Sequence, residues 1–188
     1  MTTDTDQALV ERASHDPQAF RQLYGLYFPR LYAYISYRVG RVQDAEDLTA
    51  AVFLRVVEEL GRFQWRHDQS FAAWLFRIAH NLVSNFHRDN RSTAASTLPL
   101  EDLPDIPSNA LLPGDLVERK EAFRHLRSLV DELPPRRREA ITLKYFGGLQ
   151  NREIAAVLGL DERTVASNLS RALDDLQSKY NAEAMLRE

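Results

Sequence analysis

Residues 151–173 read NREIAAVLGLDERTVASNLSRAL, which is the pattern of a helix-turn-helix. In the first predicted helix, over 151–158, the small side chain of Ala155 lets a second helix cross closely. Gly159 gives the turn a residue that tolerates unusual backbone angles, and Asp161 is placed to cap the second helix. Apolar residues at helical spacing predict the buried stripes of the two helices: Ile154, Ala155 and Leu158, then Val165, Leu169, Ala172 and Leu176.

The opposite face of the second helix is polar and carries Arg163, Thr164, Ser167, Ser170 and Arg171. A helix of this kind can enter the major groove of DNA with its first turns at the base edges. The alternative is a structural helical hairpin whose polar face is only solvated.

Helical periodicity continues outward from this motif. Residues 71–86 place apolar side chains three and four positions apart without a miss, and 44–60 repeat the pattern. A third helix over 23–35 is predicted to be bent or interrupted at Pro29. Further helices are predicted over 116–130, 135–146 and 161–178. Since we find no convincing strand pattern, we expect an all-α protein in two small helical domains.

A Pro-rich acidic segment separates these domains. Residues 98–115 contain four of the eight prolines and four acidic residues, but no basic one. Because proline removes a backbone donor and keeps the preceding residue out of helix, we expect an extended linker. The predicted organisation is therefore a domain over 1–97, a linker over 98–115 and a domain over 116–188. The linker supplies the negative charge of the chain, since both domains are close to neutral.

The predicted helix over 71–86 has a basic face opposite its apolar stripe. This face and its extension consist of Arg77, His80, Asn81, Ser84, His87, Arg88 and Arg91, with no acidic residue among them. Hydrogen-bonding side chains flanked by arginines suit contacts with bases and phosphates. Trp65 precedes this helix in a predicted loop, where it either stacks on an exposed base or belongs to the core. The run Arg136–Arg138 is a further basic cluster, although such runs are usually solvated helix faces.

The sequence argues against a dedicated active site. It has no cysteine, no histidine pair at metal-binding spacing, no glycine-rich phosphate loop and no Gly-x-Ser-x-Gly motif. We therefore expect no catalytic residue, no cofactor and no metal. The sequence also lacks a signal-peptide pattern and any apolar run of about 20 residues, so we expect a cytoplasmic protein.

Three segments resemble the extracytoplasmic-function (ECF) group of bacterial sigma factors, in the order found in that family. RLYAYI at 30–35 and DAEDLTAAVFLR at 44–55 resemble its first helices, and FAAWLFRIAHNLV at 71–83 is similar to its region 2.4 signature. LPPRRREAITLKYFGGL at 133–149, followed by the helix-turn-helix, resembles region 4.

The resemblance implies that the chain joins RNA polymerase core and promoter DNA. The first domain would bind the β′ clamp helices through Asp44, Glu46, Asp47 and Leu48. It would hold the unwound −10 element with Arg77, His80, Asn81, Ser84, Asn85, Arg88 and Trp65, Asn81 lining a flipped-base pocket. The second domain would read the −35 element with Arg163, Thr164, Ser167, Asn168, Ser170 and Arg171, and would rest on the β flap. The linker would run toward the active centre, and an anti-sigma factor is a possible further partner.

The chain departs from the family pattern at two places. In the recognition helix, the family's usual basic residues are replaced by Ala166, Asn168, Ser170 and Leu173, which would weaken salt-dependent binding. Ala50 and Ala51 stand where the family has Gln-Glu. These departures motivate an alternative: a sigma-like decoy that binds an anti-sigma protein without initiating transcription. The complete first-domain signature favours the initiation factor.

Overall fold

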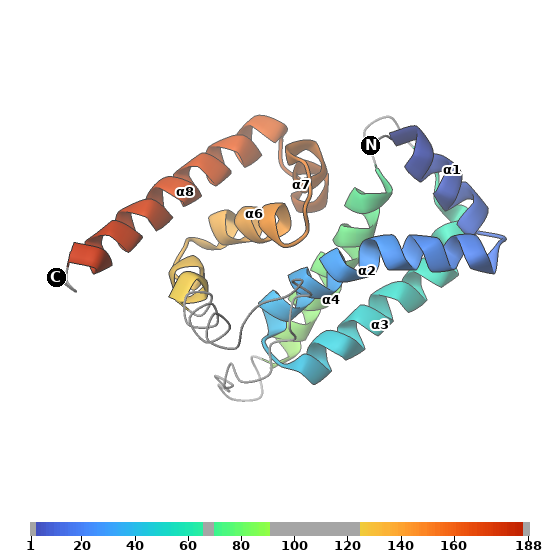
Figure 1. Cartoon of the computed structure of the whole chain (residues 1–188), viewed down its shortest axis with the longest axis horizontal. Coiled ribbons are helices and arrows are strands. Elements are labelled where there is room, and N and C mark those ends of the chain that lie inside the picture. Colours follow the sequence, from blue (N-terminus) through green and yellow to red (C-terminus); the bar gives the residue numbers. More distant parts are fainter. Residues whose placement is uncertain (1–2, 66–69, 91–124, 186–188) are drawn as a thin grey trace, which may run out of the picture.

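The computed structural model describes residues 3–65, 70–90 and 125–185, and the described residues contain helices and no strand. Four helices form an N-terminal bundle: α1 (Thr3–Ala13), α2 (Pro17–Val39), α3 (Val42–Glu59) and α4 (Phe71–Asn90), with a 3₁₀ turn over Leu60–Arg62. A C-terminal bundle contains a helical segment over 125–131, α6 (Pro135–Tyr145), α7 (Asn151–Leu158) and α8 (Glu162–Met185). The all-α prediction is thus confirmed (Figure 1).

Helix α2 is the centre of the N-terminal bundle, where it packs against α1, α3 and α4. It is continuous through Pro29, so of the predicted bend or interruption there, the interruption is wrong. Pro29 cannot bond the carbonyl of Gly25 one turn earlier, but both residues are exposed and water can satisfy that carbonyl. Helix α1 was not predicted, and α8 extends beyond the predicted end at 178.

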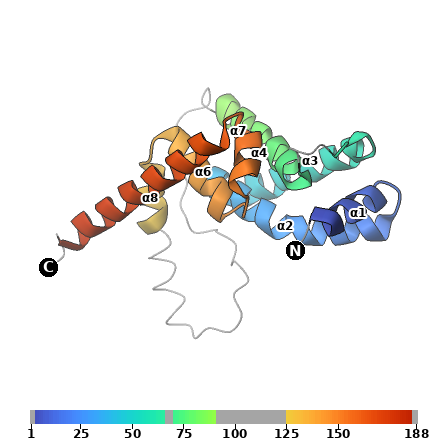
Figure 2. The ribbon, with the colours of Figure 1, turned by 90° about the horizontal axis from the view of Figure 1, so that it is seen from above.

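The two bundles pack against each other. Helix α7 lies beside α4, as Figures 1 and 2 show, while α8 reaches away toward the C-terminus. One continuous core joins the bundles and includes Tyr34 and Phe76 from the first with Leu143, Leu149 and Ile154 from the second. Phe76 is fully buried although it lies outside the apolar stripe predicted for its helix. Its buried side faces the C-terminal bundle, where a Cβ added to Gly147 would come within 2.8 Å of the Phe76 ring.

The predicted linker over 98–115 and Arg91 lie outside the described residues. The predicted helix over 116–130 is described only from 125 onward, where it is helical.

Candidate nucleic-acid interface

The helix-turn-helix has the geometry that its sequence predicts. Gly159 adopts a left-handed backbone with φ of 65°, and nothing lies within 4 Å of where its Cβ would be. Asp161 caps α8 by accepting a hydrogen bond of 2.7 Å from the Thr164 backbone N–H, and its carboxylate also accepts one from the Thr164 hydroxyl. These bonds lower the pKa of Asp161, those from the Thr164 hydroxyl and N–H most. The turn and the cap thus fix the angle between α7 and α8.

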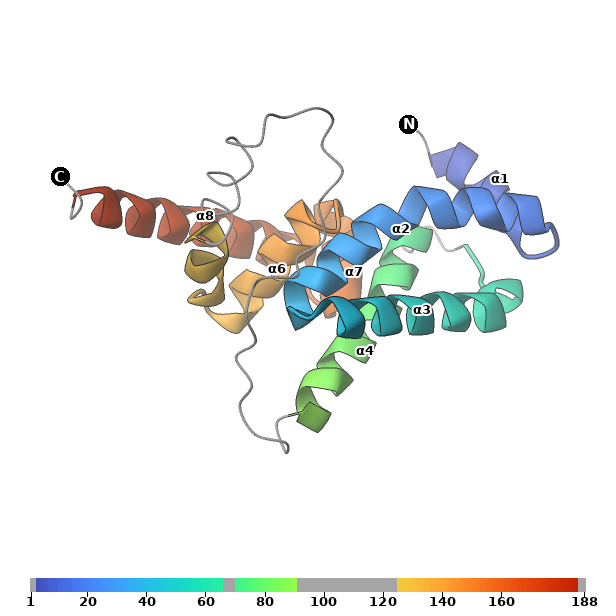
Figure 3. The same ribbon diagram turned by 60° about the horizontal axis from the view of Figure 1, so that its bottom comes forward.

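The predicted −35 side chains lie along the outer face of α8. Arg163, Ser167, Ser170 and Arg171 are exposed, and Thr164 and Asn168 are half-buried. The predicted buried stripe is confirmed at Val165, Leu169 and Ala172. The acidic residue Asp175, one turn further along α8, is neutralised by an ion pair with Arg137 of α6. The first half of α8 therefore presents a polar face with two exposed arginines to solvent. Figure 3 shows α8 reaching away from the N-terminal bundle toward the C-terminus.

The predicted −10 side chains fall into two groups along α4. Asn81, Ser84, Asn85 and Arg88 are exposed. Arg77 and His80 instead face the C-terminal bundle: Arg77 donates a hydrogen bond to the Ala156 carbonyl, and His80 Nδ1 lies 3.0 Å from Glu139 Oε1. Two of the seven predicted −10 residues thus contact the C-terminal bundle in this conformation.

Glu139 is the centre of the contact between the bundles. Its side chain is 9% exposed and meets three residues of the N-terminal bundle. The Tyr34 hydroxyl donates a bond of 2.7 Å to Oε1, Arg38 forms an ion pair with Oε2, and His80 adds the contact given above. Burial by itself would raise the pKa of Glu139, but the bonds from His80 and Tyr34 and the charge of Arg38 outweigh burial and hold this pKa below its ordinary value. Glu139 is therefore a buried carboxylate that stays ionised.

Around Glu139, further hydrogen bonds join the bundles, and again the donor belongs to the N-terminal bundle and the acceptor to the C-terminal bundle. Arg30 donates bonds of 2.8 and 3.0 Å to the carbonyls of Gly147 and Gly148. Tyr37 donates to Asp131 at 3.2 Å, and burial followed by this carboxylate raises the pKa of the Tyr37 hydroxyl. Donors of the N-terminal bundle thus meet acceptors of the C-terminal bundle.

The beginnings of α4 and α7 are also joined. Ser70 Oγ accepts the backbone N–H of Ala73 at 3.1 Å, which caps α4. The same hydroxyl donates a bond of 2.7 Å to Glu153 Oε1, while Glu153 Oε2 accepts the Gln150 N–H at the start of α7. One carboxylate therefore holds two helix N-termini together.

Trp65 lies at the edge of the core. It is half-buried, and its ring makes an edge contact with Phe63, with ring centroids 5.7 Å apart. Phe63 in turn packs against Phe71 and Trp74. The position agrees with the core alternative, and the role of Trp65 at an exposed base stays a prediction.

The predicted polymerase-binding residues lie along the first turns of α3. Glu46 and Asp47 are exposed, whereas Asp44 and Leu48 are half-buried. Asp44 stabilises the start of the helix and pairs with Arg41 at 3.8 Å. The sequence reasoning missed two apolar side chains on the next turns of this helix, Leu54 and Val57, which are 62% and 59% exposed. The sequence could have indicated their exposure, because both residues lie outside the apolar stripe that α3 buries.

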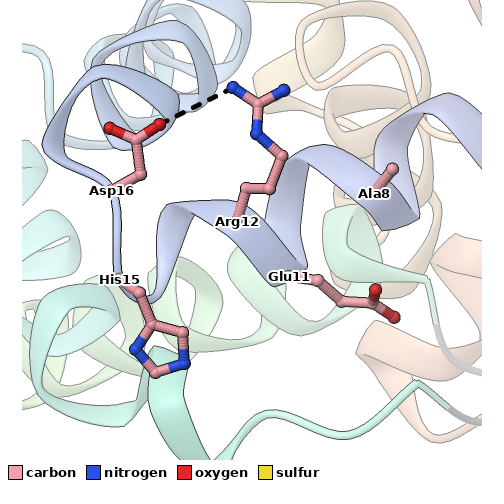
Figure 4. A pocket seen from close by; sticks show the side chains of 5 residues that line it. All are labelled: Ala8, Glu11, Arg12, His15 and Asp16. Atoms are coloured by element: carbon pink, nitrogen blue, oxygen red, sulfur yellow. Dashed lines mark ion pairs between the residues drawn. The ribbon is translucent and has the colours of Figure 1, made fainter.

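The structure offers little as a small-molecule or metal site. Figure 4 shows a shallow hollow at the turn from α1 to α2, lined by Ala8, Glu11, Arg12, His15 and Asp16. The Arg12–Asp16 ion pair there, 3.6 Å long, is largely exposed. The described residues hold no cluster of three or more acidic or histidine side chains arranged for a metal ion. Among these residues, none of the helices combines the length and hydropathy needed to cross a lipid bilayer.

Comparisons with known proteins match both bundles. The model of Sigma-70 region 2 matches residues 23–93, and that of Sigma-70, region 4 matches residues 123–176. The chain is 35% identical over 179 residues to the ECF RNA polymerase sigma factor BldN of Streptomyces coelicolor, covering 92% of this chain and 66% of that relative. It is 31% identical over 199 residues to the RNA polymerase sigma-H factor of Pseudomonas aeruginosa, covering 100% of this chain and 99% of that relative.

A solved structure is also similar over most of the chain. CnrH, in complex with the cytosolic domain of CnrY, aligns with a TM-score of 0.68 and 25% identity, covering 94% of this chain and 97% of CnrH.

Proposed function

The chain belongs to the ECF group of RNA polymerase sigma factors, and from this premise we propose that it binds polymerase core, recognises −35 and −10 promoter elements and directs transcription initiation. The observation that carries the proposal is the presence, in one chain, of two helices with polar faces suited to DNA: α4 in region 2 and α8 in region 4.

Helix α8 would read the −35 element in duplex DNA. Its exposed residues Arg163, Ser167 and Arg171 are spaced to follow one groove, and the fixed turn at Gly159 sets their approach. Because the family's additional basic residues are absent, hydrogen bonds to base edges would account for more of the recognition than phosphate contacts do.

Helix α4 would hold the unwound −10 strand. Asn81 is exposed, and the hydroxyl of Ser84 and the amide of Asn85 lie on the following turn, which supports this role. Extruding a base costs a few kcal/mol in stacking and pairing, so a side chain that bonds the extruded base favours the melted promoter. Arg77 and His80 would join this surface once they are released from the C-terminal bundle.

The polymerase core would dock on α3. Glu46 and Asp47 supply exposed negative charge for the β′ clamp helices, and the apolar Leu54 and Val57 extend the same helix surface. Burying two large exposed side chains at the centre of an interface contributes more to affinity than rim charges do. The chain has Ala50 and Ala51 where the family has Gln-Glu. This difference would then weaken binding to the core polymerase less, because small side chains let the β′ clamp helices approach α3 closely.

Residues 1–97 and 116–188 would act as separate domains on the promoter, joined by the acidic linker over 98–115. The second would rest on the β flap, and the linker would follow the path of nucleic acid toward the active centre, since its acidic residues mimic phosphate charge. The place of action would be the cytoplasm.

A protein partner of the anti-sigma kind is supported by the comparison with CnrH, which was solved with a partner bound. The decoy alternative is not favoured, because the chain matches a sigma factor over nearly its whole length and carries both DNA-facing helices.

The test is transcription in vitro with purified core polymerase and fragmented genomic DNA, followed by sequencing of the transcript starts. We expect starts with shared upstream motifs that appear only when the protein is added. Non-specific starts alone, beside a control sigma factor that works, would overturn the proposal and point to the decoy.

The variant Asn81→Ala separates two steps of this function. We expect normal binding to core polymerase but about tenfold slower open-complex formation on duplex templates, because only the extruded base loses its partner. Permanganate reactivity of the melted strand measures the step. Normal melting by this variant would contradict the assignment of Asn81.

A further inference from the structure

The outer face of α8 has long side chains only at its two ends. This reading face consists of Arg163, Ser167, Ser170 and Arg171, all of which are exposed. Neither of the two guanidinium groups forms an ion pair with another described residue. The two serine side chains between them end in a short hydroxyl group. If α8 lies in a groove of DNA, only the two arginines therefore extend far from the helix.

The spacing of the two arginines sets the length of DNA that they can span. Positions 163 and 171 both lie in α8, and at about 1.5 Å of rise per residue they are about 12 Å apart along the helix axis. A turn of about 100° per residue places them about 40° to either side of Ser167. Since stacked base pairs are about 3.4 Å apart, a helix along the major groove would bring the two guanidinium groups to bases about three to four steps apart.

Thr164 is next to Arg163 but is already engaged within the chain. Its backbone N–H and its hydroxyl both donate to the Asp161 carboxylate, at 2.7 and 2.5 Å. The hydroxyl has a single proton, so while the cap is formed Thr164 cannot donate that proton to a base. The cap fixes the first turn of α8, to which Arg163 belongs. Base reading at this end of the helix therefore depends on Arg163.

The other end of the reading face is followed by acidic residues. Asp174 is exposed one turn beyond Arg171, and Asp175 is paired with Arg137. Residues three positions apart on a helix are neighbours, so a phosphate bound by Arg171 would be repelled by the Asp174 carboxylate. The acceptors on a guanine edge carry no net charge, so this repulsion is smaller there. The neighbour thus favours a base contact for Arg171 over a phosphate contact.

We propose that Arg163 and Arg171 determine the −35 specificity of this chain, each by binding one guanine, on base pairs about three to four steps apart. Ser167 and Ser170 leave the pairs between them weakly specified. The inference rests on the proposed function, because it concerns the same helix. Arginine donates two hydrogen bonds to guanine O6 and N7, whereas a serine hydroxyl can bond several bases. The duplex that α8 selects is thus strict at two positions and tolerant between them.

The test is selection from a duplex DNA library with about ten randomised base pairs, a window longer than α8 can contact through its reading face. The full-length protein selects the DNA, with and without core polymerase, and the bound fraction is sequenced. We expect an enriched motif with two guanines about three to four steps apart and little preference between them.

Two variants should each change one position of the motif. Arg163→Gln and Arg171→Gln should lower affinity for the parent motif on the order of tenfold and shift the preference at one guanine toward adenine, which glutamine bonds through N6 and N7. Ser167→Ala should change affinity less than about threefold. The matched control is Arg136→Gln, which removes the same charge from an exposed residue of α6, outside the reading face, and should leave the motif unchanged. Circular dichroism shows whether each variant is folded.

The outcomes separate this inference from the proposed function. If an arginine variant binds all sequences more weakly by one factor, with a salt slope reduced by about one and an unchanged motif, that arginine contacts phosphate and the inference is wrong. An enriched motif without the two guanines, or no enriched motif, overturns it as well. Specific transcript starts would in those cases leave the initiation factor in place. The expected motif and its changes in the variants, without any specific start, would support the inference and overturn the proposed function.

Discussion

The two helices that we propose to face DNA differ in what lies over them. The outer face of α8 is exposed from Arg163 to Arg171, and of the two acidic residues that follow, Asp174 is exposed and Asp175 is paired to Arg137. Helix α4 has lost Arg77 and His80 to the C-terminal bundle and keeps only its second half exposed. In the proposed function, the helix that would read duplex DNA is exposed, whereas two of the side chains that would hold single-stranded DNA contact the C-terminal bundle.

This difference follows from the chemistry of the two targets. Duplex DNA is available before any melting, so an exposed reader can search for its site. A donor-rich surface for unpaired bases binds acceptors without much sequence information, and if left open it would capture single strands and other anions indiscriminately. In this conformation, Arg77 and His80 of that helix already contact acceptors of the same chain.

The largest expected effect concerns Phe76, which is fully buried between α2, α4 and the turn at Gly147. Phe76→Ala should lower the free energy of unfolding by about 3–5 kcal/mol, because it leaves a cavity shared by both bundles. Leu173→Ala on the exposed helix, where the side chain is 46% exposed, should cost less than about 1 kcal/mol. Urea denaturation measures both. Equal losses of unfolding free energy in the two variants would contradict the contrast between α4, which is partly covered, and α8, which is exposed.

The next effect concerns pH. The pKa of Glu139 lies below its ordinary value of 4.5, so ionised Glu139 stabilises the contact between the bundles. This contribution to stability is complete when the pH is above the ordinary pKa, and it is lost as the pH falls through the lowered pKa. Each unit by which the pKa is lowered corresponds to about 1.4 kcal/mol of stability.

Arg38, His80 and Tyr34 face this carboxylate, and Arg138 precedes it in α6. The free energy of unfolding, recorded by urea denaturation from pH 7 down to pH about 3, should fall at the acidic end, and Glu139→Gln should make that fall smaller. A parent and variant with the same pH profile would show that other groups stabilise the contact between the bundles.

A smaller effect on stability is expected at Gly159, in the turn before α8. Gly159→Ala should lower stability by about 1 kcal/mol, because a side chain is strained at φ of 65° while no neighbour blocks it. Thermal unfolding measures the loss. A gain in stability would show that the turn relaxes to another conformation.

The smallest effect is expected far from both DNA-facing helices. Arg12→Ala breaks an ion pair whose side chains are 60% and 44% exposed, and should change stability by less than about 0.5 kcal/mol. A loss above about 1 kcal/mol in thermal or urea unfolding would mean that the turn from α1 to α2 supports the core more than its exposure indicates.

The features that the sequence predicts well are those with local causes. The apolar spacing over 71–86 becomes α4, and the Gly159 turn and the Asp161 cap appear as expected, because each depends on residues within a few positions. Helix α1 was missed since its polar sequence gives only a weak apolar stripe, and it is stabilised by packing against α2.

The contact between the bundles could not be predicted in the same way. Glu139 follows three arginines and looks like part of a solvated charge run, but its partners Tyr34, Arg38 and His80 lie 105, 101 and 59 positions earlier. Phe76 likewise lies off the periodic stripe because its neighbour Gly147 comes from the other bundle. The assignment of Arg77 and His80 to DNA stays a prediction, and only the tertiary structure shows that they contact Ala156 and Glu139 in this conformation.

The attachment of both helices to one chain has a consequence for the order of events at a promoter. A tethered bundle has a fixed effective concentration, so diluting the protein does not release Arg77 and His80 from it. In the proposed function, duplex DNA held by α8 would gain the same advantage, because the neighbouring promoter sequence would then also be a tethered ligand. Capture of the −35 element would thus raise the local concentration of the −10 strand at α4, and melting would follow recognition.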